Sequence, residues 1–338
     1  MSNPDASRAA RTSTNLATVK GFSTLVIVMG HSGLGIPSFW VVVTVGLLVF
    51  TISSGFFTWQ RYHGAFSWAT FWKRKIVRLF PRLIVINLFL LGWFLLQRYW
   101  VMDWLEVKAR TTGLVSWHTL ISWLGMKGFI TWFRVQNMSP YGGGMWFLTM
   151  LLLFYALYPV IEPLYRKKIA AVAFTVMGLL LLFWLHTVVL YTHALWLTAC
   201  GFLVGLCLAR TELHLPAAIS GGVAVVATGV MLGGHFLFQF DGANFFFILL
   251  IALAGLLFCM EINLPLAVNR IGGWLSGVLL EVYLIHPYFR LTPTDMKAVN
   301  VVISVVTVLA LSSLLAGVAD RTIQYCSAFS ARRGAVVT

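Results

Sequence analysis

The strongest constraint on the fold is a series of ten apolar stretches, each about as long as a bilayer is thick. A membrane-spanning helix needs about 20 mostly apolar residues, and in lipid the backbone polar groups have to pair within the segment, which favours helices. The composition agrees, because 59% of the 338 residues are hydrophobic and only 10% are charged. A soluble or disordered chain is excluded, and we predict an all-α, polytopic membrane protein. The predicted spans are 21–37, 39–59, 79–101, 145–162, 169–190, 191–209, 216–237, 244–261, 272–290 and 299–319.

The Lys and Arg residues between these stretches predict the orientation of the chain. Cytoplasmic segments of membrane proteins carry an excess of such residues. With both termini in the cytoplasm, sixteen of the 24 Lys and Arg residues fall on the cytoplasmic side and seven on the outer side, with Arg82 at the inner edge of the third span. We therefore expect a flexible cytoplasmic tail over 1–20, a transmembrane domain over 21–320 and a cytoplasmic tail over 321–338.

Charge and cysteine usage exclude several other roles. The net charge is +14, but the basic residues lie between apolar runs, where membrane orientation and lipid contact explain them without nucleic acid. The four cysteines form no C-x-x-C pair and no histidine group has ligand spacing, so neither disulfides nor a metal site is predicted. The longest polar interruption, 102–144, holds four tryptophans and ends in three glycines, which is typical of an interfacial segment followed by a hinge.

Lys20 and His31 are the first ionisable residues that a membrane helix would not carry without a reason. They are eleven residues apart in KGFSTLVIVMGH. At about 100° and 1.5 Å per residue they return to one helical face, with His31 about 16 Å further along. Gly30, Gly33 and Gly35 would let a helix or a substrate approach the imidazole closely. The alternative is a buried histidine bonded to a backbone carbonyl.

Lys75, Arg78 and Arg82 form a basic stripe, with Arg74 beside it. The three residues follow an i, i+3, i+7 spacing in FWKRKIVRLFPR, which places them on one helical face. The guanidinium of arginine donates two parallel hydrogen bonds to phosphate oxygens, and lysine adds a point charge. The stripe therefore predicts a phosphate-binding site. The alternative is a juxtamembrane cluster that fixes topology and binds anionic lipid headgroups.

Glu281, Tyr283 and His286 lie in the ninth predicted span, within LLEVYLIHPYF. A carboxylate there needs a wet cavity or a cationic partner, which Lys20 or an arginine of the basic stripe would supply. His286 is followed by a proline near the outer end of the span, so a helix-terminal histidine and a substrate contact are equally consistent with its position. Tyr283 is either a substrate contact or a packing aromatic.

Five segments in this order resemble the acyltransferase 3 family of integral-membrane O-acyltransferases. KGFSTLVIVMGH is similar to the family's first span, FTISSGFFTW to its serine-glycine-phenylalanine motif and FWKRKIVRLFP to its arginine-rich stretch before a proline. MWFLTMLLLFYALYP, which contains Trp146, resembles its Trp-Phe-Leu span, and LLEVYLIHPYF its late Tyr-Leu-Ile-His segment.

The resemblance implies an enzyme that moves an acyl group, commonly acetyl, from cytoplasmic acyl-coenzyme A (acyl-CoA) to a hydroxyl of a glycan or another acceptor. By resemblance His31 is the catalytic histidine, Lys20 stands where the family commonly has a functional arginine, and Lys75 and Arg78 occupy its R-x-x-R positions. Ser54, Gly55 and Phe56 would carry the serine-glycine-phenylalanine role. Lysine at positions 20 and 75 keeps the positive charge but not the paired grip of arginine.

The residues and the resemblance fit one mechanism. We expect the phosphates of acetyl-CoA at the cytoplasmic mouth and its thioester at His31, which would act as general base on the acceptor hydroxyl. Glu281 would orient this imidazole or balance Lys20, and a covalent acyl intermediate on His31 or Ser54 is an alternative. The residues expected to bind the donor are Lys75, Arg78, Arg74 and Arg82, and those expected to support the substrate or the structure are Ser54, Gly55, Phe56, Trp146, Tyr283 and His286.

The acceptor is the least constrained part of this expectation. Similar stand-alone proteins are the exopolysaccharide and lipopolysaccharide O-acetyltransferases, so we expect a multi-pass protein of the bacterial inner membrane that modifies a cell-envelope or extracellular polysaccharide or its lipid-linked precursor. The alternative function is a transporter or flippase of a glycan intermediate, with His31 and Glu281 as proton relays; the lack of repeated halves argues against it. The sequence does not predict an oligomeric state.

Overall fold

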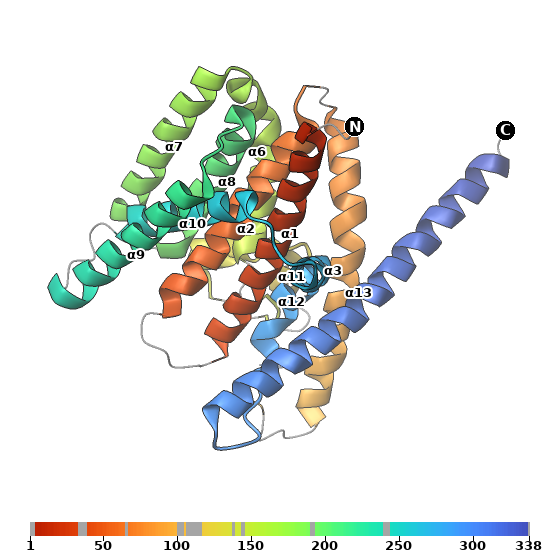
Figure 1. Cartoon of the computed structure of the whole chain (residues 1–338). Coiled ribbons are helices and arrows are strands. Elements are labelled where there is room, and N and C mark those ends of the chain that lie inside the picture. Colours follow the sequence, from red (N-terminus) through yellow and green to blue (C-terminus); the bar gives the residue numbers. More distant parts are fainter. Residues whose placement is uncertain are drawn as a thin grey trace. The chain divides into compact units, whose positions relative to one another are not determined.

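In the computed structural model the regular elements of the described residues are helices, as the sequence predicts (Figure 1). The structure describes residues 4–32, 39–64, 67–99, 105, 117–136, 139–142, 146–189, 193–238 and 244–336. Within these ranges no residue belongs to a β-strand, and the β structure amounts to one isolated antiparallel bridge between Leu105 and Leu291.

The elements, in chain order, are α-helices (α) and short 3₁₀ helices (η). They are α1 (Pro4–His31), α2 (Phe39–Tyr62), α3 (Trp68–Tyr99), α4 (Trp117–Trp123), α5 (Gly128–Trp132), α6 (Trp146–Ile161), η1 (Glu162–Tyr165), α7 (Lys168–Val188), α8 (His193–Thr211), α9 (Ala217–Phe238), α10 (Asn244–Glu261), α11 (Leu266–Gly277), α12 (Leu279–Ile285), η2 (His286–Tyr288) and α13 (Lys297–Val336).

Seven of the described helices are long and apolar enough to cross a membrane, fewer than the ten spans that we predicted. These are α2, α3, α6 continued by η1, α7, α9, α10 and α13. The other three predicted spans differ for separate reasons. The first half of α1 is polar, and the apolar part of α8 comprises only Leu195–Thr211. The predicted span 272–290 is divided among α11, α12 and η2, because the helix is interrupted at Val278.

Both predicted tails contain helix. Helix α1 begins at Pro4, so residues 4–20, which we expected to be flexible, are helical. This segment is held in place by polar contacts: Asn15 donates to the carbonyl oxygens of Cys259 and Ile262 at 2.7 and 2.8 Å, and Arg8 pairs with Glu261 at 2.6 Å. At the other end, α13 continues through the predicted tail to Val336.

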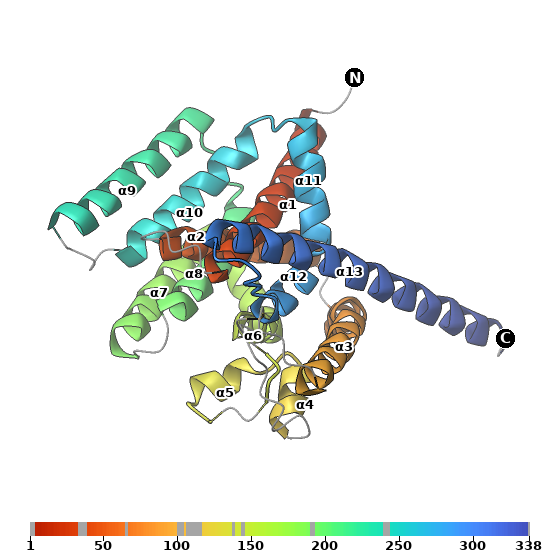
Figure 2. The ribbon, with the colours of Figure 1, turned by 90° about the horizontal axis from the view of Figure 1, so that it is seen from below.

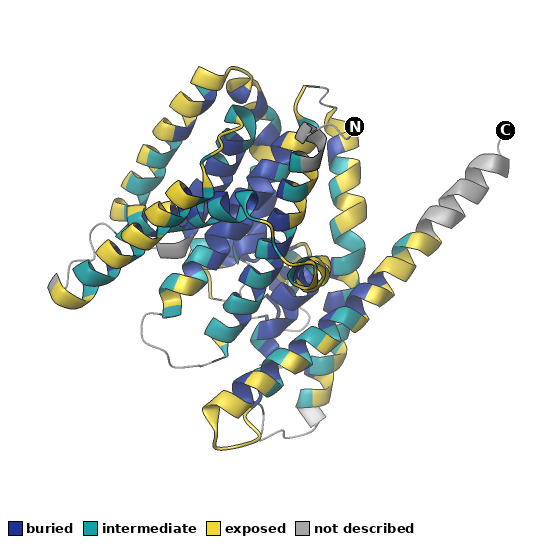
Figure 3. Ribbon diagram, viewed as in Figure 1, coloured by how far each residue is buried: buried dark blue, intermediate teal, exposed yellow. Residues whose placement is uncertain are grey.

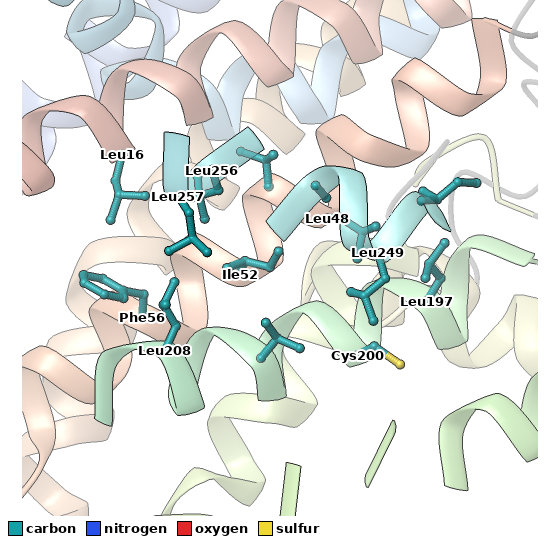
Figure 4. Close-up of a cluster of buried hydrophobic side chains, with 14 of the residues drawn as sticks. Leu16, Leu48, Ile52, Phe56, Leu197, Cys200, Leu208, Leu249, Leu256 and Leu257 are labelled. Atoms are coloured by element: carbon teal, nitrogen blue, oxygen red, sulfur yellow. The ribbon is translucent and has the colours of Figure 1, made fainter. Parts of the chain in front are cut away.

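The chain divides into two compact units. The first comprises Met1–Gly30, Gly35–Ala65 and Leu153–Ser276, and the second comprises His31–Leu34, Phe66–Leu152 and Gly277–Thr338. In the first unit α2 packs along α8. Most residues of α2 between Thr44 and Trp59 are buried (Figure 3). Leu48, Ile52 and Phe56 of α2 belong to a large apolar cluster shared with α8 and α10 (Figure 4).

Glycines permit the close approach of α2 and α8. A Cβ atom on Gly55 of α2 would overlap the carbonyl oxygen of Phe202, and one on Gly205 of α8 would overlap that of Ile52. Small residues at such positions are typical of helix pairs in membranes, where packing rather than water exclusion drives association. The rest of the first unit is built onto this pair: α7 packs on α8, and α9 runs beside α10 (Figure 2).

In the second unit α12 packs against both α3 and α13, which also contact each other. Every residue of α12 except Leu280 is buried. An aromatic cluster lies nearby, in which the ring of Phe94 meets those of Tyr141 at 5.0 Å and Tyr288 at 5.2 Å. The Tyr288 hydroxyl donates to the carbonyl oxygen of Pro140 at 3.1 Å, so η2 is fixed at its last residue.

Candidate active site

His31 is the last residue of α1 and is exposed. Its ring lies against that of His286, with the centroids 5.1 Å apart and the planes inclined by 62°. Both histidines belong to the second unit. Gly30, just before His31, leaves room for Val43 and Phe39, while Gly33 and Gly35 lie outside the described residues. The structure therefore brings together two histidines that the sequence analysis had considered separately.

His286 opens η2 and is only 4% exposed. Its Nδ1 lies 2.8 Å from the carbonyl oxygen of Tyr283 and 3.2 Å from that of Val282. Since a carbonyl oxygen only accepts hydrogen bonds, Nδ1 carries a proton, and in the neutral ring Nε2 is an acceptor. The ring of Tyr283 lies 5.9 Å from His286 and 5.5 Å from Phe147. The two histidines are too far apart in the sequence for any spacing rule to have paired them.

Glu281 is fully buried and paired with Arg82, one of the two kinds of cation that we expected to face it. Nη1 of Arg82 lies 2.8 and 3.1 Å from the two carboxylate oxygens, and it also donates to the carbonyl oxygen of Gly277 at 3.1 Å. Nη2 binds Asp320 of α13 at 2.7 Å. One guanidinium thus joins α3, α12 and α13. The sequence analysis did not identify Asp320, although a carboxylate directly after the last apolar run could have been recognised as a candidate partner for a cation.

The basic stripe lies on one continuous helix, α3. The Lys75 ammonium sits over the ring of Phe71, 5.3 Å from its centroid, and Arg74 and Arg78 are exposed. Arg82 differs from them, because its guanidinium already donates hydrogen bonds to two carboxylates and one backbone carbonyl oxygen. Of the four residues expected to bind the donor, Arg74 and Arg78 are therefore exposed, Lys75 is half-buried and Arg82 is bound within the protein.

Lys20 lies in the same helix as His31, eleven residues before it. Its ammonium sits over the ring of Phe50 of α2, 4.5 Å from the centroid. This cation–π contact is one that the sequence analysis did not foresee, because it joins two helices of the first unit. Glu281, which we considered as a partner for Lys20, is bound instead by Arg82.

Ser54, Gly55 and Phe56 take part in the packing of α2. The Ser54 hydroxyl is 5% exposed and donates to the carbonyl oxygen of Phe50 at 2.8 Å. Gly55 admits the backbone of α8, and Phe56 belongs to the apolar cluster of the first unit. Trp146 begins α6 and contacts the ring of Phe147 at 5.9 Å.

Lys127 is a buried cation that the sequence analysis missed. It lies outside the helices that could span a membrane, is 8% exposed, and donates to the carbonyl oxygen of Tyr141. Burial lowers the pKa of Lys127 to about 8, because a low-dielectric environment disfavours the charged form. Gly142, at φ 84°, leaves room for its side chain. The rest of the expected hinge, residues 143 and 144, lies outside the described residues, as does most of 102–116.

The described residues contain no group of three or more His, Cys, Asp or Glu side chains that could hold a metal ion. A family model described as an acyltransferase domain matches residues 14–319. A search of curated proteins found no match, and a search of solved structures found none.

Proposed function

This chain belongs to the acyltransferase 3 family and is a membrane acyltransferase, and we propose that it transfers an acetyl group from acetyl-CoA to a hydroxyl of a polysaccharide. The proposed acceptor is a cell-envelope or extracellular polysaccharide or its lipid-linked precursor, modified at the bacterial inner membrane. The observation that carries the proposal is the exposed imidazole of His31 at the end of a helix of this family's domain, next to a second, buried imidazole.

His31 is the proposed general base. A sugar hydroxyl is a weak nucleophile near neutral pH, whereas an imidazole can accept its proton there. As His31 takes the proton, the hydroxyl oxygen forms a bond to the thioester carbonyl carbon of acetyl-CoA. The carbon–sulfur bond then breaks, and the leaving thiolate takes the proton back from the imidazolium. The products are the acetyl ester and coenzyme A, and the histidine returns to its neutral form.

The donor phosphates are proposed to bind Lys75, Arg78 and Arg74. Two of these residues, Arg74 and Arg78, are exposed and Lys75 is half-buried, and basic side chains spaced along one helix suit the several phosphates of the coenzyme. Arg82 and Glu281 are proposed to hold α12, and with it His286, in place. Lys20 remains a proposed catalytic charge on the helix that carries His31. A direct transfer is favoured over an acyl-Ser54 intermediate, because the Ser54 hydroxyl is buried and bonded to the backbone of its own helix.

Replacing His31 tests the proposal. We expect His31→Ala, purified in detergent, to transfer labelled acetyl from acetyl-CoA to isolated envelope polysaccharide at least about 100-fold more slowly than wild type, because general-base catalysis contributes about that much. His63→Ala is the control, since His63 is also exposed and has no proposed role in the reaction. Near-wild-type transfer by folded His31→Ala protein would refute the role of this imidazole.

A further inference from the structure

We propose that His286 is a positioning residue that acts through His31, holding the His31 imidazole in the orientation in which it takes the proton of the acceptor hydroxyl. The starting point is the contact between the two rings, whose centroids are 5.1 Å apart. At this separation nitrogens of the two rings can share a hydrogen bond of about 3 Å. The role of His286 rests on the proposed function, because it presupposes His31 as the base.

The protonation of His286 is fixed by its surroundings. Two backbone carbonyl oxygens face Nδ1 and require a proton on that nitrogen, so the neutral ring offers Nε2 as an acceptor. The ring is 4% exposed, and burial disfavours a second proton. His286 therefore presents Nε2 as its acceptor nitrogen.

The position of His286 is fixed as well. It is the first residue of η2 and directly follows α12, which is buried against α3 and α13. The last residue of η2 is held by the hydrogen bond of the Tyr288 hydroxyl. The titratable side chains in ring contact with it are His31 from α1 and Tyr283 from α12. The paired charged side chains on the elements packed with α12 are Arg82 of α3 and Asp320 of α13, and Arg82 also binds Glu281 in the first turn of α12.

This arrangement gives the second imidazole a definite task. A free histidine exists as two tautomers, and only one of them has its lone pair toward the acceptor hydroxyl. An acceptor at Nε2 of His286 favours the tautomer of His31 whose N–H points to His286, and it stabilises the imidazolium after the proton is taken. A partner of this kind acts on the rate of transfer and not on donor binding.

Two substitutions of His286 distinguish its proposed role in orienting His31 from a role in packing alone. In His286→Asn the amide can still donate to the carbonyl oxygens of Val282 and Tyr283, but the acceptor at the Nε2 position is gone. In His286→Gln the amide places an acceptor oxygen near that position. We expect H286N to lower kcat of acetyl transfer at least tenfold with KM for acetyl-CoA unchanged within twofold, and H286Q to recover part of the loss.

Combining H286N with His31→Ala distinguishes action through His31 from an independent effect. We expect H286N to reduce activity no further in the His31→Ala background, because the group on which His286 acts is missing. Equal reductions in both backgrounds, or a raised KM with unchanged kcat, would overturn the proposal. If H286N fails to purify as folded protein, H286Q undergoes the same comparison and is expected to show a smaller loss that is likewise absent in the His31→Ala background.

Chemical labelling of His31 does not depend on acyl transfer, so it tests the pairing with His286 separately from the proposed role of His31 as the base. Diethyl pyrocarbonate transfers an ethoxycarbonyl group to an unprotonated imidazole nitrogen and releases ethanol and carbon dioxide. We expect H286N to change the labelling rate of His31, relative to that of the exposed His63, by at least threefold. His118→Asn is the matched control, because His118 is as buried as His286. An unchanged ratio in H286N would overturn the pairing, whereas active His31→Ala protein with a changed ratio would overturn only the proposed base.

Discussion

At the residue scale, the decisive contact is the shared guanidinium of Arg82. Glu281 is fully buried and Asp320 is half exposed, so the two carboxylates depend on Arg82 to different degrees. A buried ion pair adds little net stability when complete, but removing one partner leaves an uncompensated buried charge. Arg82 is therefore needed mainly because Glu281 is present.

We predict that Arg82→Met destabilises the protein by about 3–5 kcal/mol and that adding Glu281→Leu restores most of the loss. Thermal unfolding in detergent measures both. Lys168→Met is the control: its pair with Glu212 is exposed on both sides, and an exposed pair contributes at most about 1 kcal/mol. A double variant as unstable as Arg82→Met would contradict the explanation.

The residues of the site were predictable to different degrees. Electrostatics required a cation for Glu281 and left Lys20 and the arginines of the stripe as alternatives; only the packing of α3 on α12 selects Arg82. The pairing of His31 with His286 depends on tertiary structure alone. Whether these residues carry the proposed roles stays a prediction.

At the scale of single elements, the close packing of α2 on α8 depends on glycines, which have no Cβ atom at the contact. We predict that Gly55→Ala lowers the unfolding temperature and the yield of folded protein, because the new methyl group would meet the backbone of α8. Gly222→Ala is the matched control on α9, where nothing lies within 4 Å of the added atom, and it should be neutral or slightly stabilising. Equal effects of the two substitutions would mean that the contact is not tight.

The basic stripe of α3 gives a second prediction at this scale. We expect Lys75→Ala combined with Arg78→Ala to raise KM for acetyl-CoA at least about tenfold, a loss of about 1.4 kcal/mol, with little change in the amount of folded protein. Lys73→Ala combined with Lys167→Ala is the control, because it removes the same charge from two exposed positions outside the stripe. An unchanged KM in the first pair would leave the stripe with its topological role alone.

The helices themselves were the most predictable elements, because apolar runs of this length have few alternatives in lipid. The interruption at Val278 was missed. Gly277 just before it was the available signal, since glycine weakens a helix interior, but hydropathy alone treats glycine as an acceptable residue of a span.

At the scale of the whole molecule, hydropathy predicted the class of protein correctly, and it predicted ten spans where seven described helices are long and apolar enough to cross a membrane. Seven of the described helices meet the requirements, and α1, α8 and the α11–α12 segment supply the remaining apolar stretches. The count matters because an odd number of crossings would put the termini on opposite sides, whereas ten would put both in the cytoplasm.

We predict that reporters fused to the N-terminus and to the C-terminus both give a cytoplasmic signal in cells, because that orientation leaves most basic residues inside. A reporter inserted at Gly125, in the segment expected to lie outside, supplies the opposite signal. An outer signal from one terminus would mean an odd number of crossings. One of the three segments α1, α8 and α11–α12 would then lie at the membrane surface and not cross the bilayer.

The length of α13 locates the Arg82 network relative to the lipid. Ala298 to Ala319 form an uncharged run of 22 residues that ends at Asp320, and at about 1.5 Å per residue it is about 33 Å long. The hydrocarbon layer is about 30 Å thick, so one crossing uses up this run and leaves Asp320 level with the headgroups. Arg82, which binds Asp320 directly, then sits at the same depth. The cost of keeping these charges is accordingly that of a boundary and not of the bilayer centre.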